Sequence, residues 1–377
     1  MSKKPDVAIL GAGVVGQALA LLLARERLKV ALVAPSASGT ASGAPDIRAY
    51  ALNAASRQLL QSLRAWPDEV TPAVITPVRS MWVSEPAAGE PAALRFPGPD
   101  SGEPVAWIAD VPALEAALAQ AVRYQPGIER VEQAPERVAL TVVCEGRRST
   151  SRDAMGFTYE RKPYAHTAIA ARLQGERPHG GVARQWFLGG DILALLPLDG
   201  EQGHAVALVW SMDHARAAQH LALPPEAFAQ AVAQACDHAL GAMTLQGQPA
   251  GWPLELSRAT HWVKPGVALA GDAAHAMHPL AGQGLNAGLA DVAVLAQVLQ
   301  AREYWRPLGD LKLLRRYERA RQADLRAMQW VTDSLYGLFG QADPRLQALR
   351  RWGLRGFDRL APLKRWAMQQ AMGQARP

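Results

Sequence analysis

Three observations predict an α/β protein made of two interleaved units followed by a helical C-terminal segment. An apolar strand near the start of the chain leads directly into a glycine-rich turn and a helix. The middle of the chain carries several short β-rich runs separated by turn residues. A strand, a loop and a helix then return, and the pattern is helical from Leu311 onward. A sheet is therefore predicted to be inserted into the first α/β unit.

Composition and charge exclude several classes of protein. The chain has 377 residues, of which 49% are hydrophobic and 20% charged, so it can bury a large core and is not disordered. Its two cysteines, Cys144 and Cys236, cannot form a disulfide framework, and no cysteine or histidine spacing suits zinc. These features favour a cytoplasmic protein without a metal.

The net charge of +6 is concentrated in the last part of the chain. Residues 345–377 contain eight lysine or arginine residues and one acid, which leaves the remainder near neutral, so nucleic-acid binding is not expected. On a helical wheel one side of this segment carries Leu346, Leu349, Trp352, Phe357 and Leu360, and the opposite side carries Arg351, Arg355 and Arg359. It is predicted to be a basic amphipathic helix that binds an anionic membrane surface. The alternative is an ordinary helix packed on its own domain.

The first element is a strand over residues 6–10, followed by the turn from Gly11 to Gly16, a helix, and a second strand over residues 29–34. Gly11, Gly13 and Gly16 have the G-x-G-x-x-G spacing that permits a tight turn, close approach of a pyrophosphate and close helix packing. The order strand, turn, helix predicts dinucleotide binding. Apolar residues 7–24 also resemble a signal peptide, but three glycines interrupt them, which argues against that alternative.

The middle of the chain is predicted to form antiparallel strands with a turn at Asp199-Gly200. The strands are expected at residues 78–84, 166–173, 184–188, 192–198 and 204–210.

The most informative stretch is residues 271–291, GDAAHAMHPLAGQGLNAGLAD, which follows a buried strand at residues 267–270 and runs into a helix at residues 284–300. Asp272 can accept hydrogen bonds from a polyol. The backbone amides near Gly284 and Leu285 present the positive end of a helix dipole to an anionic ring, such as a reduced flavin.

These two motifs together resemble the class A FAD-dependent monooxygenases, and most closely the ubiquinone-biosynthesis hydroxylases of the octaprenyl-methoxyphenol hydroxylase type. The similarity covers most of the chain and includes six further segments. They are Asp46-Ile47-Arg48-Ala49, Trp107-Ile108-Ala109-Asp110, residues 164–172, residues 183–187, the LALLPL strand and Tyr317-Glu318-Arg319 with Arg321.

The resemblance implies a Rossmann-like FAD-binding domain interleaved with an antiparallel-sheet substrate domain and a helical C-terminus. The FAD-binding domain would comprise residues 1–76, 105–157 and 253–340, the substrate domain residues 77–104 and 158–252, and the basic C-terminal segment residues 341–377. Gly11, Gly13, Gly16 and Arg48 would hold the adenosine-diphosphate side of FAD, and Asp272 the ribitol. The isoalloxazine would be framed by Pro279, Gly282, Gln283, Gly284 and Asn286.

The implied activity is hydroxylation of the aromatic ring of a polyprenylated phenol or quinone precursor, with FAD as cofactor, NAD(P)H as co-substrate and dioxygen. The implied setting is ubiquinone biosynthesis, in a protein assembly at the inner face of the membrane. Two alternatives stay open: a hydroxylase or reductase of a soluble substrate, and a weakly catalytic or non-catalytic accessory subunit. No catalytic side chain is identified, although His278 is a weak candidate for orienting a phenol. HxxH at His275 and His278 lacks a third zinc ligand, so structural roles are favoured.

Three departures from the family pattern concern the cofactor. Ala34 occupies the strand end where an acid would bind the adenosine ribose, and Glu145 replaces the aspartate of a GADGxxS-like element. Only 18 residues separate Pro126 from Glu145, too few for a multistranded meander, so a hairpin is expected to be missing. Trp186 and Phe187 are less favoured as walls of a substrate pocket than as core residues.

Overall fold

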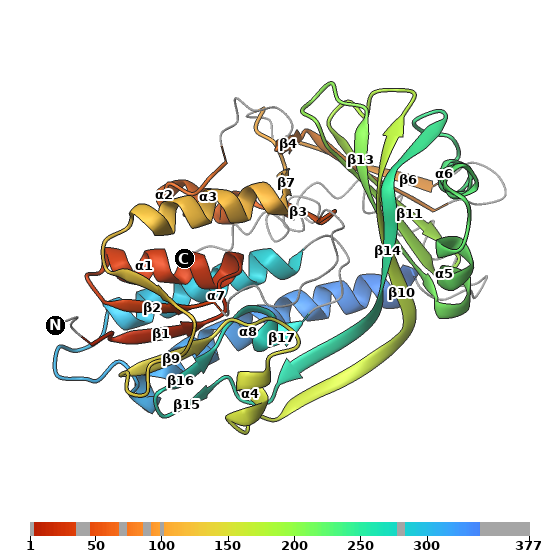
Figure 1. Ribbon diagram of the computed structural model, residues 1–377. Helices are drawn as coiled ribbons and strands as arrows, with labels where there is room; N and C mark the ends of the chain where they lie inside the picture. Colours follow the sequence, from red (N-terminus) through yellow and green to blue (C-terminus); the bar gives the residue numbers. More distant parts are fainter. Residues whose placement is uncertain are drawn as a thin grey trace.

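The computed structural model describes residues 4–34, 46–67, 74–85, 92–98, 102–276 and 283–339. Within these ranges the chain forms three sheets and two groups of helices, arranged as two units joined by a pair of long strands (Figure 1). No helix in the described ranges is long and apolar enough to cross a membrane.

The first unit contains a six-stranded sheet in the order β15-β16-β9-β1-β2-β8. Four of its five strand pairings are parallel, and the fifth is the antiparallel β15–β16 hairpin. The strands are β1 (Val7–Leu10), β2 (Val30–Val33), β8 (Ile128–Val131), β9 (Leu140–Val143), β15 (Val263–Lys264) and β16 (Val267–Leu269).

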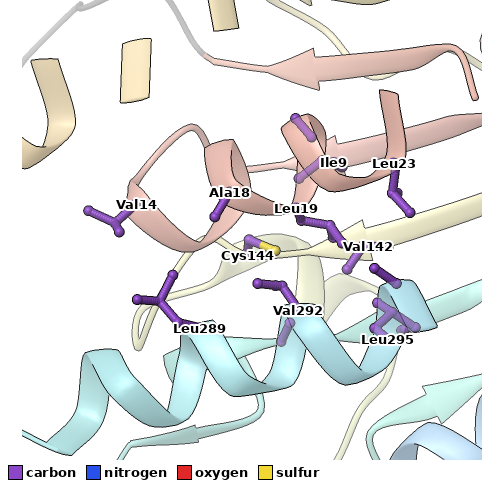
Figure 2. Close-up of a cluster of buried hydrophobic side chains, with 14 of the residues drawn as sticks. Ile9, Val14, Ala18, Leu19, Leu23, Val142, Cys144, Leu289, Val292 and Leu295 are labelled. Atoms are coloured by element: carbon purple, nitrogen blue, oxygen red, sulfur yellow. The ribbon is translucent and has the colours of Figure 1, made fainter. Parts of the chain in front are cut away.

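The helices of the first unit pack on this sheet and on one another. Figure 2 shows side chains of α1 and α7 meeting, with Cys144 at the end of β9 between them. Gly288 of α7 lies against Val15 of α1 so closely that a Cβ atom there would lie 2.8 Å from the valine side chain. The helices are α1 (Val14–Arg25), α2 (Ala54–Ser62), α3 (Val111–Tyr124), α4 (Thr150–Ala154), η1 (Gly271–Ala273), α7 (Gln283–Gln300) and α8 (Leu311–Phe339).

The second unit is an eight-stranded sheet in the order β17-β14-β10-β13-β12-β11-β5-β6. One face is covered by α5 (His214–Leu221) and α6 (Pro225–Ala235), whose Phe228 and Val232 join a core with the sheet (Figure 1). The strands are β5 (Ser80–Glu85), β6 (Ala92–Pro97), β10 (Tyr159–Gly175), β11 (Val182–Leu188), β12 (Asp191–Pro197), β13 (Ala205–Asp213), β14 (Met243–Ala259) and β17 (His275–Ala276).

The structure corrects two details of the expected sheet. The run at residues 78–84 is split after Val78, because β4 (Ile75–Val78) joins a separate three-stranded sheet with β3 (Ala49–Leu52) and β7 (Ala106–Asp110). The strands are not all antiparallel, since β5 pairs parallel to β11. The turn expected at Asp199-Gly200 is present, with both residues at positive φ.

The two units share the strands β10 and β14 instead of meeting at a linker. These strands pair antiparallel from Tyr159↔Ala259 near the first unit to Gly175↔Met243 in the second. Figure 1 shows them running between the two units. The expected boundary between residues 252 and 253 therefore falls inside a continuous strand, and the domain limits stay a prediction.

Candidate functional site

A cavity of about 930 Å³ lies between the two units. At one end it is lined by the glycine-rich turn, Arg48, the loop from Glu145 to Arg148, and Asp272 with the start of α7. At the other end it is lined by strands of the eight-stranded sheet. The structure thus brings sequence-distant motifs of the first unit into one cavity and places the inserted sheet opposite them.

The three glycines of the first motif have separate roles. Gly11 has φ +107°, and a Cβ atom there would lie 2.6 Å from the Cys144 carbonyl oxygen. A Cβ atom on Gly16 would collide with the carbonyl of Gly11, whereas one on Gly13 would meet nothing within 4 Å. Gly11 and Gly16 therefore permit the tight turn and the close helix packing, and Gly13 leaves open space beside the N-terminus of α1.

Asp272 has the properties of a ligand-binding carboxylate. It lies in η1 after β16, lines the cavity, and makes no side-chain hydrogen bond with any described residue. Burial raises its pKa above the usual value, although Arg147 and His275 act in the opposite direction. A Cβ atom on Gly284 would lie 4.0 Å from Asp272 Oδ1, so the carboxylate is next to the first turn of α7. An unpartnered carboxylate beside a helix N-terminus fits a polyol carrying an anionic ring.

Two sets of contacts hold the η1 turn that carries Asp272. On one side, Tyr159 donates its hydroxyl hydrogen to the Asp272 carbonyl at 2.9 Å, and the guanidinium of Arg152 lies 3.5 Å from the centre of the Tyr159 ring. The Arg152 side chain is fully buried. The turn is therefore held through its backbone, which leaves the carboxylate of Asp272 available to a ligand.

On the other side lies a buried network centred on Asp291 of α7. Asp291 Oδ2 accepts from the Gly271 amide at 2.9 Å and lies 2.7 Å from His275 Nε2, while Oδ1 accepts from Arg321 Nε at 2.8 Å. The His275 ring stacks on Trp262. Burial would raise the pKa of Asp291, but His275 and Arg321 outweigh it and lower the pKa. His275 therefore has a structural role, and no described group of three or more metal-ligating side chains includes it.

Arg48 lines the cavity but is already paired within its own segment. Its Nε donates to Asp46 Oδ1 at 2.9 Å and its Nη2 to Asp46 Oδ2 at 2.5 Å. The pKa of Asp46 is lowered mainly by this hydrogen bond, and Glu115 lies 3.9 Å from the same guanidinium. Because the Arg48 side chain stays 46% exposed, it can still face an anionic ligand while Asp46 sets its direction.

Asn286 lines the cavity, yet its side chain holds protein elements together. Oδ1 accepts from the Asn53 amide at 3.0 Å and from Ser56 Oγ at 2.7 Å, and Nδ2 donates to the Ala51 carbonyl at 2.7 Å. It thereby joins α7 to β3 and α2. Gln283 is the first residue of α7, and its side chain is outside the description, as are His278, Pro279 and Gly282.

The departures from the family pattern have visible local consequences. Ala34 directly follows β2, donates its amide hydrogen to the Val131 carbonyl, and has no side-chain acceptor for a ribose hydroxyl. Glu145 accepts from Ser149 Oγ at 2.6 Å and from Ser151 Oγ at 2.7 Å, which ties it to the start of α4. Residues 132–139 connect β8 to β9 without any strand, as expected for a missing hairpin.

The sheet end of the cavity is mostly apolar and contains small side chains. Trp186 does not line it, because this residue lies in the core beneath α5 and α6, 5.2 Å from the ring of Trp82. The side chains that β11, β12 and β13 direct toward the cavity are Ala183, Gln185, Ile192, Ala194, Leu196, Val209 and Ser211.

Fold and site together define a dinucleotide-binding flavoprotein with a second, sheet-based chamber. The FAD binding domain family matches residues 126–333. The chain belongs to this family of FAD-dependent monooxygenases, which includes the ubiquinone-biosynthesis hydroxylases, and FAD is its cofactor.

Curated relatives match almost the whole chain. The ubiquinone hydroxylase UbiL of Rhodospirillum rubrum is 30% identical, over 98% of this chain and 90% of the relative. The 3-demethoxyubiquinol 3-hydroxylase of Escherichia coli is 32% identical, over 99% of this chain and all of the relative. Among solved structures, the p-nitrophenol 4-monooxygenase PnpA of Pseudomonas putida superposes with a TM-score of 0.76 at 18% identity over both entire chains, which shows a shared fold.

Proposed function

We propose that this protein hydroxylates the aromatic ring of a polyprenylated phenol or quinone precursor in ubiquinone biosynthesis. The reaction takes one ring C–H, dioxygen, NAD(P)H and a proton to a ring C–OH, water and NAD(P)⁺. The observation that carries the proposal is that the FAD-binding motifs and an apolar chamber face each other across one cavity. The activities of the two relatives that align over almost the whole chain support the choice of pathway.

The residues around the cavity have defined roles in this proposal. Gly13 leaves room for the pyrophosphate, Arg48 faces the adenosine-diphosphate side, and Asp272 accepts from the ribitol hydroxyls. Pro279, Gly282, Gln283 and Gly284 frame the isoalloxazine, and Asn286 supports this frame through α2 and β3. The bound FAD supplies electron transfer from the nicotinamide to dioxygen and transfer of one oxygen atom to the ring.

The protein's contribution is to position the ring and to exclude water. The apolar side chains of β11, β12 and β13 form the chamber opposite the FAD-binding motifs. Such a chamber protects reactive oxygen species from water and strengthens the electrostatic effect of the α7 amides. No nucleophilic side chain is needed for this chemistry.

The test is oxygen incorporation together with cofactor content. We expect purified protein to be yellow and to introduce one atom of ¹⁸O from ¹⁸O₂ into a short-chain methoxyphenol when supplied with NADH or NADPH. Gly13→Trp should remain folded by circular dichroism but contain no FAD, because the indole would fill the space beside α1.

Two results would contradict the proposal. A folded wild-type protein that stays colourless with added FAD would support the accessory-subunit alternative. A yellow protein that oxidises NAD(P)H and introduces no ¹⁸O into any phenol would support a flavin-dependent reductase.

A further inference from the structure

The two faces of the central strands β11, β12 and β13 differ in composition. Trp186, Leu193, Leu195, Leu208 and Trp210 point toward α5 and α6 and form the core of this unit. The alternate residues point toward the cavity, and five of the seven are Ala183, Ile192, Ala194, Leu196 and Val209. The remaining two, Gln185 and Ser211, carry polar side chains.

Gln185 and Ser211 make no side-chain hydrogen bond or ion pair with the residues that the structure describes. Ser211 is only 6% exposed. Gln185 is partly exposed, so its amide is open to a ligand that supplies the hydrogen bonds water would otherwise make. Both groups line the cavity, so a ligand in the cavity can reach them.

The strand register places the two groups on either side of an apolar platform. Gln185 pairs with Ala194, and Ser211 pairs with Ile192, so Ile192 and Ala194 of β12 lie between them. Strands β11 and β13 are both neighbours of β12 and are therefore about 10 Å apart. This spacing leaves room for one aromatic ring lying on the platform with a polar group at each edge.

Charge separates this end of the cavity from the cofactor end. Six of the seven charged lining residues belong to the first unit, and they are Arg48, Glu115, Glu145, Arg147, Arg148 and Asp272. The seventh, Arg184 of β11, is the one that lies at the sheet end, and its Nη1 donates to the carbonyls of His179 and Val182. A carboxylate on the ring would therefore lose its hydration here, and the lining cation on this side, Arg184, already donates to two carbonyls.

We propose that Gln185 and Ser211 determine substrate specificity by hydrogen bonding the oxygen substituents of an uncharged aromatic ring that lies over Ile192 and Ala194. This inference rests on the proposed hydroxylase function and narrows its substrate class. A hydroxyl and a primary amide can each donate and accept, so they suit phenol, ether and quinone oxygens.

The test compares the affinities of three probes for the FAD-loaded protein. Binding is measured by the change in flavin absorbance. The probes are 2-methoxy-6-methylphenol, its isostere 2-ethyl-6-methylphenol, which lacks the ether oxygen, and 4-hydroxybenzoate. We expect wild type to bind the methoxy compound about 2- to 13-fold more tightly than the isostere, the range that one hydrogen bond provides. It should bind 4-hydroxybenzoate most weakly.

Two variants and two controls locate the contacts. In the double variant Ser211→Ala/Gln185→Met the preference for the methoxy compound should disappear, while each single variant identifies which side chain meets the ether oxygen. The controls are Ser84→Ala, a buried serine of β5 that pairs with Trp186 on the helix-covered face, and Gln246→Met on exposed β14. Both should behave as wild type.

An unchanged preference in the double variant would overturn the inference, and so would tighter binding of 4-hydroxybenzoate by wild type. Failure of the proposed function gives a different result. In that case the neutral rings still bind through Gln185 and Ser211, but no ¹⁸O enters them.

Discussion

Asp272 is a carboxylate that folding places in a less favourable environment than water. Burial raises its pKa in the folded protein, so its charged form opposes folding at neutral pH. This destabilisation is present above the folded-state pKa and is lost as the pH falls toward the unfolded value near 4. The cost is consistent with a group kept for ligand binding.

We predict that Asp272→Asn raises the melting temperature of the FAD-free protein at pH 7 and weakens FAD binding about 10- to 150-fold. Differential scanning fluorimetry between pH 4 and pH 7 should show the stability gain shrinking as the pH is lowered. Glu136→Gln, an exposed carboxylate, is the control and should change neither property. A variant that retains wild-type FAD affinity would remove Asp272 from the site.

The second prediction for a single residue concerns Ala34 and the affinity for FAD. Because a methyl group occupies the strand end expected to bind the adenosine ribose, Ala34→Glu should tighten FAD binding about 5- to 150-fold by adding hydrogen bonds to the ribose hydroxyls. Isothermal titration with FAD measures the change. Ala34→Leu adds volume without an acceptor and should not tighten binding. Equal affinities in wild type and Ala34→Glu would indicate that Ser36 or a backbone group already binds the ribose.

Among single residues, those in the motifs were easier to predict than the residues that hold the motifs in place. The spacing of Gly11, Gly13 and Gly16 has a physical meaning that the sequence alone conveys, and the contacts agree with it. The network of His275, Asp291 and Arg321 joins residues from three elements with no fixed spacing, although Asp291 and Arg321 both lie in segments that carry the family resemblance. The amide of Asn286 was expected beside the ring, and its protein contacts depend on how α2 and β3 pack against α7.

At the scale of elements, the short turn η1 is held by α7 and α8 through Asp291. The carboxylate of Asp291 is completely buried, and its lowered pKa means that it stabilises the fold above about pH 4 and loses this effect as the pH falls through its folded-state value. Removing the charge would leave Arg321, whose side chain is only 6% exposed, without its buried partner.

We therefore predict that Asp291→Asn lowers the free energy of unfolding at pH 7 by about 3–5 kcal/mol, measured by urea denaturation. The matched control is Asp324→Asn, which removes the other carboxylate bound by Arg321 but lies 64% exposed at the surface. That control should cost less than about 1 kcal/mol. Similar losses of unfolding free energy in the two variants would show that the buried Asp291–Arg321 pair stabilises the fold no more than the exposed Asp324–Arg321 pair.

The elements themselves were predicted well where hydrophobic periodicity and turns coincide. The strand, turn and helix at the start of the chain and the helix after residue 283 lie where the sequence places them. The split of residues 78–84 was not predictable, because β4 and β5 are both apolar runs and only tertiary pairing assigns them to different sheets. The parallel pairing of β5 with β11 likewise depends on segments far apart in the chain.

At the scale of the whole molecule, the basic residues 345–377 lie outside the described part of the structure, and their role remains a prediction from sequence. A net charge of +7, with Trp352 and Trp366 as interfacial side chains, should give reversible attachment to anionic vesicles, at roughly 1 kcal/mol per basic residue near the surface. A chain ending at Asp343 should lose co-sedimentation with phosphatidylserine vesicles and keep its activity on a short-chain phenol. The control is neutral phosphatidylcholine, to which neither form should bind. Equal sedimentation of the two forms with the anionic vesicles would show that the segment is an ordinary packed helix.

The strands β10 and β14 also determine how the molecule must fold. Tyr159 at one end of this pair lies beside Ala259, 100 residues later in the chain, and both strands contribute residues to each unit. Neither unit can reach its final form until this distant pairing has closed, and ordering the long intervening chain slows that step. We therefore expect the cavity between the units to form late in folding. We also expect partial unfolding on either side of this strand pair to disrupt the cofactor site and the substrate chamber together.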